Sequence, residues 1–217
     1  MNGHLVSSYM PIFINGAIMT LEITLISIVC ATILGFFVAL MRLSNSKILR
    51  TISFLYVWIF RGTPLLLILF FVYYAPPFGI QLSAFIAGII AMSINSASFK
   101  SEIIRAGILS VDKGQLEAAE AIGMSPMKRM FRILLPQAIR LIIPPYINNA
   151  VILLKESAQV SIITVPDLML QAQKAYNSTY SPMETLGVAG VLYLAMSSLL
   201  MLLQFFCEKK LRISPKR

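Results

Sequence analysis

Charged residues are scarce in this chain: they make up 12% of its 217 residues, and the mean hydropathy is +0.81. An ordinary soluble domain carries about 25% charged residues, so this composition excludes a conventional soluble fold. Apolar runs of about 20 residues, long enough to cross a bilayer, recur along the sequence instead. The composition therefore predicts an all-α integral membrane protein, with a single transmembrane domain over residues 1–217.

Histidine and cysteine are nearly absent as well. The only histidine is His4, which excludes a His-based triad or a multi-His metal site. The two cysteines, Cys30 and Cys207, lie in different apolar segments without metal-ligand spacing, so we expect them to pack in the core. The sequence also has no Gly-rich Lys-Ser/Thr phosphate loop and no G-x-S-x-G nucleophile turn. We therefore expect neither an enzyme nor a resident metal.

The apolar residues group into five predicted spans, and the basic residues fall between them. Lys and Arg are plentiful after the first, third and fifth spans, absent from the second connection, and represented only by Lys174 in the fourth. The positive-inside rule then puts the N-terminus outside and the C-terminus in the cytoplasm. The net charge of +9 follows from this topology, and we expect no nucleic-acid partner. The predicted spans are residues 12–41, 52–74, 82–106, 142–163 and 186–206.

The long central connection, about residues 110–136, predicts two short cytoplasmic helices. Asp112 and Gln115 have the spacing of a capping box, and Gly123 suits a helix C-terminus. Ser125-Pro126 then suits the start of a second helix. Small alanines on the first helix would let a partner surface approach closely. The alternative is an amphipathic segment lying on anionic lipid at the inner leaflet.

The same connection carries a specific motif. The pattern E-A-A-x3-G-x9-I-x-L-P is met at every fixed position by Glu117, Ala118, Ala119, Gly123 and residues 133–136. It resembles the EAA loop of ABC importer permeases. The stretches RGTPLL, SEIIRAGILSV, LPQAIR and LLKESAQVSIITVPDL resemble the polar amino-acid uptake branch of that family, so the resemblance covers nearly the whole chain.

The resemblance implies a type I ABC importer permease fold, with five transmembrane helices and a cytoplasmic coupling-helix loop. It implies docking to an ABC ATPase dimer, which would bind the ATP and Mg²⁺. It further implies a second permease, either a copy of this chain or a close homologue, an extracytoplasmic solute-binding protein, and a bacterial or archaeal cytoplasmic membrane. The residues expected to couple to the ATPase are Gln115, Glu117, Ala118, Ala119 and Gly123.

One face of the third span is polar. Asn95, Ser98 and Glu102 are spaced i, i+3, i+7, so they share a helix face that we expect to line the pathway. Glu102 would attract the side chain of a polar, cationic amino acid resembling arginine, lysine or histidine. The alternative is a structural ion pair between Glu102 and Arg105 at i, i+3. Further candidates for substrate binding are Thr63, Glu156, Gln159 and Glu22.

Two proline sites affect the predicted spans. Pro64 removes a backbone donor after Arg61 and Thr63, which predicts either a helix kink or carbonyls free to bind a ligand. The pair Pro144-Pro145 is expected to set the start of the fourth span. Glu156 follows Lys155, and because consecutive helical residues do not face each other, Glu156 needs a substrate or another bundle residue as partner.

A different class of transporter competes with the ABC permease. A secondary amino-acid transporter or channel would work without an ATPase and would use intramembrane acids as ion sites. Five spans are few for inverted repeats, and no convincing internal repeat is present. The dependence of uptake on ATP and on a second chain with a phosphate loop separates the two classes.

Overall fold

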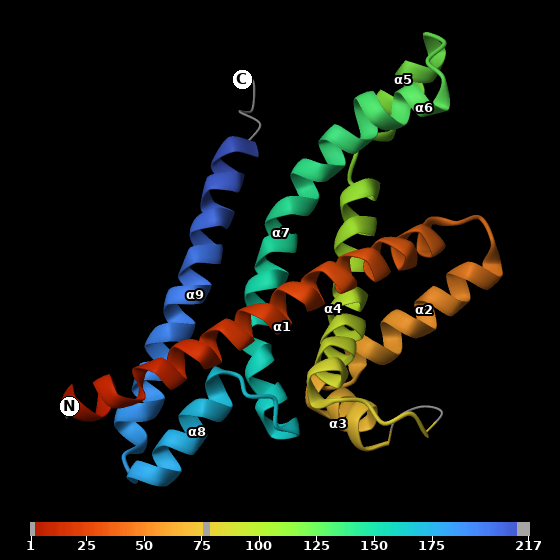
Figure 1. Ribbon diagram of the computed structural model, residues 1–217. Coiled ribbons are helices and arrows are strands. Elements are labelled where there is room, and N and C mark those ends of the chain that lie inside the picture. The colour runs from red at the N-terminus through yellow and green to blue at the C-terminus, as the bar shows by residue number, and fades with distance from the viewer. Residues whose placement is uncertain (1–2, 76–78, 212–217) are drawn as a thin grey trace.

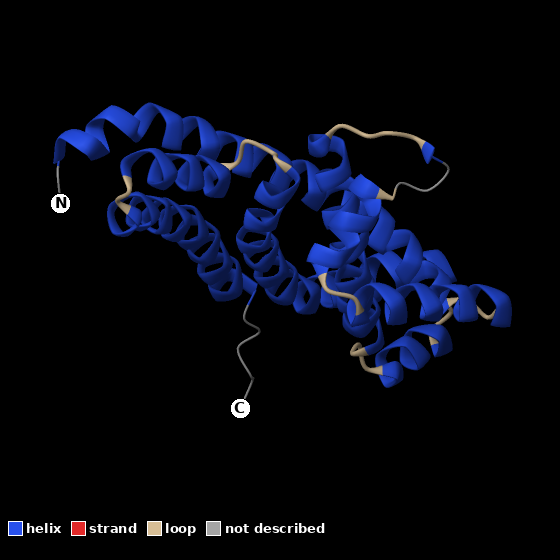
Figure 2. Cartoon of the chain, turned by 90° about the horizontal axis from the view of Figure 1, so that it is seen from below, coloured by secondary structure: helices blue, strands red, loops and turns tan. Residues whose placement is uncertain are grey.

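The computed structural model describes residues 3–75 and 79–211, and helices dominate this part of the chain (Figures 1 and 2). Long helices lie side by side or cross one another, and short connections join them. The chain order is α1 (Gly3–Leu43), α2 (Lys47–Gly62), α3 (Leu65–Tyr74), α4 (Ala84–Leu109), α5 (Lys113–Ala121), α6 (Pro126–Arg129), the π-turn η2 (Met130–Leu134), α7 (Leu135–Glu156), the 3₁₀ segment η3 (Ser157–Ile163), α8 (Leu168–Thr179) and α9 (Pro182–Leu211).

The prediction of five spans is confirmed, with one change of form. Four helical stretches are long and apolar enough to cross a membrane: α1, α4, α9 and the continuous run from α6 to η3. The fifth span is a broken one, because α2 and α3 are bent by 103° relative to each other. The predicted second span is therefore a helix and a half-length helix that meet at Pro64.

Helix α4 lies at the centre of the fold and contacts α1, α2, α3 and α7 (Figure 1). Its small residues permit close packing: a Cβ atom on Gly107 would lie 2.3 Å from the Ile142 Cγ1 atom of α7. Fully buried apolar side chains from α1, α3 and η3 complete the core around Met92, among them Ile23, Leu69 and Val160. Close approach of helix backbones through small residues is typical of membrane bundles.

The break at Pro64 is stabilised from α4. A proline has no N–H to donate to the carbonyl four residues earlier, which here belongs to Phe60. The Asn95 Nδ2 atom donates to that carbonyl oxygen at 2.9 Å, and the Thr63 hydroxyl donates to the neighbouring Ile59 carbonyl at 2.8 Å. Of the two alternatives predicted at Pro64, the structure has the helix break. The Phe60 carbonyl, which the proline leaves without its usual donor, is bonded by Asn95 and is not free for a ligand.

The expectation for Pro144-Pro145 was wrong. These prolines lie inside α7, and the helix extends back to Pro126 through the π-turn η2. The chain can stay helical because the carbonyls that lose their donors belong to Arg140 and Leu141, which are exposed. Water or lipid headgroups can bond carbonyls on an exposed surface. The fourth span therefore begins well before the proline pair.

Replacing Asn95 tests the bond across the break. The substitution Asn95→Leu keeps a side chain branched at Cγ but leaves the Phe60 carbonyl without its donor, and an unsatisfied buried carbonyl costs about 1–3 kcal/mol. We expect the unfolding midpoint in detergent to fall. The control is Ser110→Ala at the exposed C-cap of the same helix, which removes a hydroxyl bonded only to the Gly107 carbonyl of its own helix and should change the midpoint less. An equal unfolding midpoint for both variants would mean that the hydrogen bond from Asn95 does not stabilise the helix break.

Candidate functional site

The first helix of the central connection is α5, and it begins as predicted at Lys113. The Asp112 carboxylate caps it by accepting a hydrogen bond from the Gly114 N–H at 2.7 Å. The predicted capping box with Gln115 is wrong, because the Gln115 side chain is used elsewhere. Its Oε1 atom accepts a hydrogen bond from the Gln137 Nε2 atom of α7 at 2.6 Å. Gln115 therefore joins α5 to the base of the fourth span.

Gly123 ends α5 and turns the chain into α6. Its φ angle is +79°, in the left-handed region that glycine adopts without strain. The Met124 N–H donates to the Ala119 carbonyl at 3.0 Å, and the Gly123 N–H donates to the Glu120 carbonyl at 2.9 Å, as in a Schellman motif. Ser125 and Pro126 start α6 as predicted, although the Ser125 hydroxyl makes no capping bond. An ion pair between Glu120 and Arg129 holds the two short helices together.

The α5–α6 segment presents an apolar surface that no other part of the described chain covers. Ile122 is 79% exposed, Met127 67% and Phe131 61%. The alanines divide: Ala118 is exposed, whereas Ala119 is 4% exposed and packs against its own chain. Of the residues expected to couple, Gln115, Glu117, Ala118 and Gly123 are exposed. An exposed apolar patch with a polar rim is typical of a contact with another protein or with a membrane surface.

Glu102 forms two ion pairs, one with each of two arginines. Its carboxylate lies 2.8 Å from Arg105 Nη2 on the same helix and 3.0 Å from Arg42 Nε at the end of α1. The i, i+3 ion pair considered as the alternative for Glu102 is therefore present, and Arg42 extends it to a second helix. Each carboxylate oxygen of Glu102 therefore contacts an arginine, and the pair with Arg42 joins the end of α1 to α4.

Two cavities adjoin Glu102. One of about 420 Å³ is lined by residues of α2 that include Trp58 and Arg61, and another of about 430 Å³ extends to Leu141 and Pro145 of α7. Arg61 lines both, with its guanidinium 4.8 Å from the centre of the Phe99 ring. The first cavity therefore pairs Glu102 with the two guanidinium groups of Arg42 and Arg61, and the second pairs it with Arg61 alone.

The remaining candidates on α4 are used within the bundle. Asn95 is buried and bonds to the Phe60 carbonyl, and Ser98 is buried and donates to the Asn95 carbonyl at 2.6 Å. Thr63 bonds to its own helix. The predicted polar face of the third span thus holds helices together over most of its length, and only Glu102 adjoins a cavity.

The other acidic candidates lie away from Glu102. Pro145 of α7 shares a cavity with Glu102. Glu156 is the last residue of α7, eleven positions after Pro145, which is about 16 Å along a helix. Glu156 is half-buried and has no ion pair or hydrogen bond within the described chain, and Gln159 follows it in η3. Glu22 is exposed in the middle of α1. The structure therefore does not bring the predicted substrate residues into one cluster.

Two features were not predicted from the sequence. The first is the contact of Arg42 with Glu102, because a separation of 60 residues in the sequence gives no sign that the two side chains meet. Lys100 is fully buried, with its Nζ atom 3.6 Å from the centre of the Tyr146 ring and no hydrogen-bond partner in the described chain. The aromatic face can replace part of the hydration that the ammonium loses. Lys100 thus fixes α4 against α7.

Comparison with known proteins agrees with this geometry. Residues 31–213 match the family described as the binding-protein-dependent transport system inner membrane component. The arginine transport system permease protein ArtQ of Bacillus subtilis is 40% identical over 93% of each chain. A putative glutamine transport system permease protein GlnP of Rickettsia conorii is 38% identical over 97% of this chain and 99% of its own.

A solved structure is similar over its whole length. The crystal structure of an amino acid ABC transporter with histidines contains a chain with a TM-score of 0.91 and 37% identity, which covers 97% of this chain and 99% of its own. The family match covers most of the sequence, and the similarity to amino-acid permeases extends along nearly all of it. The chain therefore belongs to the binding-protein-dependent inner membrane components, as a multi-pass permease subunit of the amino-acid ABC importers, and it is not itself an enzyme.

Proposed function

We propose that this permease imports cationic amino acids and that Glu156 attracts the substrate side chain. The observation that carries the proposal is a half-buried carboxylate in a span that makes no ion pair or hydrogen bond in the described chain and has only the exposed Lys155 as a charged neighbour. An ionisable residue at membrane depth ordinarily faces a partner or a water-filled pathway. The 40% identity to an arginine permease and the similarity to a transporter structure with histidines support the choice of a cationic substrate.

Glu102 has a different part in this proposal. Its carboxylate already contacts Arg42 and Arg105, and Arg61 lies beside the same cavities, so the local charge there is positive. A cationic substrate would meet repulsion at this point unless the arginines moved away. Glu102 remains a candidate for substrate contact, and Asn95, Ser98, Thr63, Gln159 and Glu22 remain predictions.

Coupling to ATP hydrolysis is proposed to take place at the α5–α6 segment. The exposed apolar surface of Ile122, Met127 and Phe131 would bind a groove on an ABC ATPase, which supplies ATP and Mg²⁺. Closure of the ATPase dimer would then move the docked segment together with that of a second permease, and the spans would open outward to accept substrate. Gln115 would transmit this motion to α7 through Gln137.

The proposed orientation follows from the distribution of charge. Arg42, Lys47, Arg50 and Arg105 gather at the end of the bundle that also carries α5 and α6, and this end is assigned to the cytoplasm. The N-terminus then lies outside, where an extracytoplasmic solute-binding protein would deliver the amino acid. The substrate reaches Glu156 before it reaches Glu102 on this path.

Paired neutral substitutions separate the two carboxylates. Glu156→Gln removes the charge proposed to attract the substrate, so we expect the ratio of arginine to glutamine uptake to fall about tenfold or more, the effect of one lost charge-assisted hydrogen bond. Glu102→Gln removes an ion pair to two arginines, so we expect a lower unfolding midpoint with a smaller change in that ratio. Uptake is measured in vesicles that contain the permease, its ATPase and its binding protein.

The opposite pattern would reverse the assignment. A ratio that changes with Glu102→Gln and not with Glu156→Gln would make Glu102 the substrate residue. Uptake that persists without ATP would instead favour a secondary transporter. The double variant Arg42→Gln with Glu102→Gln serves as a control, because it removes both partners of one pair and should recover part of the lost stability.

Gly123 tests the coupling segment. Gly123→Leu forces a side chain into the left-handed region, which costs about 1–2 kcal/mol, and it adds bulk where the structure leaves open space. We expect the spans to fold, with an unfolding midpoint near that of the wild type, and substrate-stimulated ATP hydrolysis to drop severalfold.

Gly123→Asn is the matched control, because asparagine adopts the left-handed region readily and adds less bulk. It should keep most of the stimulated hydrolysis. Full stimulation in the leucine variant would contradict docking at this turn, and equal loss in both variants would assign the effect to glycine itself.

A further inference from the structure

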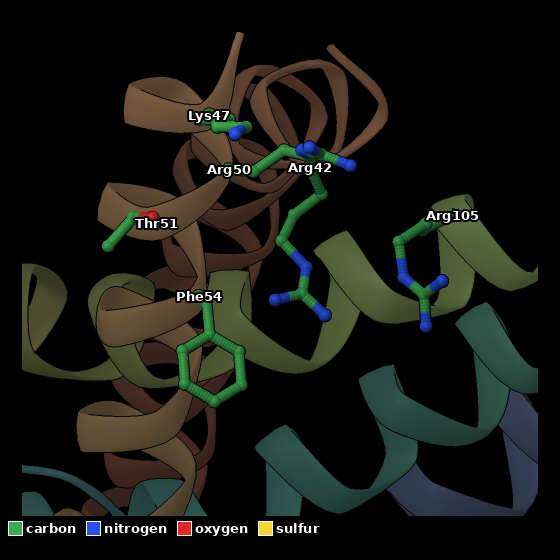
Figure 3. Close-up of a pocket in the computed structure, with 6 residues that line it drawn as sticks. All are labelled: Arg42, Lys47, Arg50, Thr51, Phe54 and Arg105. Carbon is green, nitrogen blue, oxygen red and sulfur yellow. The ribbon is translucent and has the colours of Figure 1, made fainter. Parts of the chain in front are cut away.

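A basic pocket lies between the α1–α2 connection and α4, apart from the proposed substrate residue Glu156. Its volume is about 510 Å³, and Figure 3 shows cationic side chains from all three helices around it. The Arg42 side chain extends toward the Phe54 ring, Lys47 and Arg50 lie near the start of α2, and Arg105 lies across from them on α4 (Figure 3). The lining residues are Arg42, Lys47, Arg50, Thr51, Phe54 and Arg105.

The charge of this pocket is not balanced by the described chain. Its lining has four cations and no carboxylate, and the nearest acid, Glu102, binds Arg42 through Nε and Arg105 through Nε and Nη2. Four positive charges and one negative charge leave a net charge of +3 on these five groups. Lys47 and Arg50 have no ion-pair partner in the described chain, and both are exposed. The pocket is therefore suited to an anion that several donors can bind at once.

The floor and surroundings of the pocket are apolar, which identifies the kind of anion. Phe54 lines both this pocket and the adjoining 420 Å³ cavity, where Trp58 follows it one turn further along α2. Trp58 is 67% exposed, and Ile48 at the start of the same helix is 71% exposed. A small soluble anion would leave these apolar side chains exposed, whereas the acyl chains of a phospholipid would cover them.

We propose that this pocket binds the phosphate of an anionic phospholipid from the inner leaflet, with the acyl chains along α2. The assignment of the leaflet rests on the orientation proposed above. Basic pockets between transmembrane helices on the cytoplasmic side are suited to anionic headgroups. The phosphate contacts Arg42 of α1, Lys47 and Arg50 of α2, and Arg105 of α4. The lipid thereby joins three helices at the end of the bundle that carries α5.

Trp58 is a built-in reporter for this lipid, because it is the only tryptophan of the chain. The permease is reconstituted with its ATPase into vesicles in which either phosphatidylglycerol or phosphatidylcholine carries brominated acyl chains. The signal of a Trp58→Phe complex is subtracted, which isolates the fluorescence of Trp58. We expect brominated phosphatidylglycerol to quench Trp58 more strongly than brominated phosphatidylcholine at equal content.

Variants with neutral side chains test which charges produce the preference for phosphatidylglycerol. Lys47→Gln with Arg50→Gln should lower the relative affinity for phosphatidylglycerol about tenfold or more, since each basic residue near the surface contributes about 1 kcal/mol. Lys209→Gln with Lys210→Gln removes the same charge from the exposed end of α9 and should keep the preference. Thr51→Asp leaves the cations in place, puts a carboxylate at the pocket, and should also abolish the preference.

The outcomes separate the sources of the anion. Preference that is lost in the pocket variants and kept in the α9 variant supports the proposal. Equal loss in both pairs would mean general attraction to the surface and would overturn it. Loss of the preference on adding glycerol 3-phosphate, at the concentration of the lipid, would mean a site for a free anion. Absence of preferential quenching in the wild type would mean that another protein chain covers this face of α2.

Discussion

The lack of water in the hydrocarbon core of a bilayer is the constraint on which this fold depends, because every polar group at that depth must find its partner within the protein. Helix α4 supplies several of these partners. The Tyr56 hydroxyl of α2 donates to the Ile94 carbonyl of α4 at 2.7 Å, and the Ser96 hydroxyl donates to Asn149 of α7 at 3.0 Å. Together with the bond from Asn95, these contacts place the broken second span and the fourth span against α4.

Charge is arranged along the bundle in a related way. Glu102, Arg42 and Arg105 form a compact group at the basic end, where α1, α2 and α4 meet. Glu156, at the C-terminal end of α7, follows Lys155 and forms no ion pair within the described chain. A carboxylate held by two arginines serves as a joint between helices, and a carboxylate without them is open to a ligand. The same residue type therefore has two roles, and the helices that surround each copy decide between them.

Local signals predicted much of the fold, and long-range contacts could not be predicted. Asp112, Gly123 and the Ser125-Pro126 pair placed the ends of α5 and α6 correctly, since capping depends on neighbouring residues. Spacing alone also indicated the pair of Glu102 and Arg105. It could not indicate Arg42, the bond between Gln115 and Gln137, or the acceptor of Asn95, because each depends on how separate helices pack. The expectation for Pro144-Pro145 was wrong because α7 continues through both prolines, at a point where Arg140 and Leu141 are exposed and not packed in the bundle.

The length of α1 has a consequence for the membrane itself. Its 41 residues span about 60 Å, twice the thickness of about 30 Å of a typical hydrocarbon core. The helix must therefore tilt from the bilayer normal or extend beyond the hydrocarbon core, and Figure 1 shows it crossing the bundle diagonally in front of α4. The tilt of a transmembrane helix depends on the thickness of the surrounding bilayer. Arg42 lies in the last turn of α1, at its C-terminal end. Because Arg42 pairs with Glu102, a change in bilayer thickness that altered the tilt of α1 would act on the ion pair between α1 and α4.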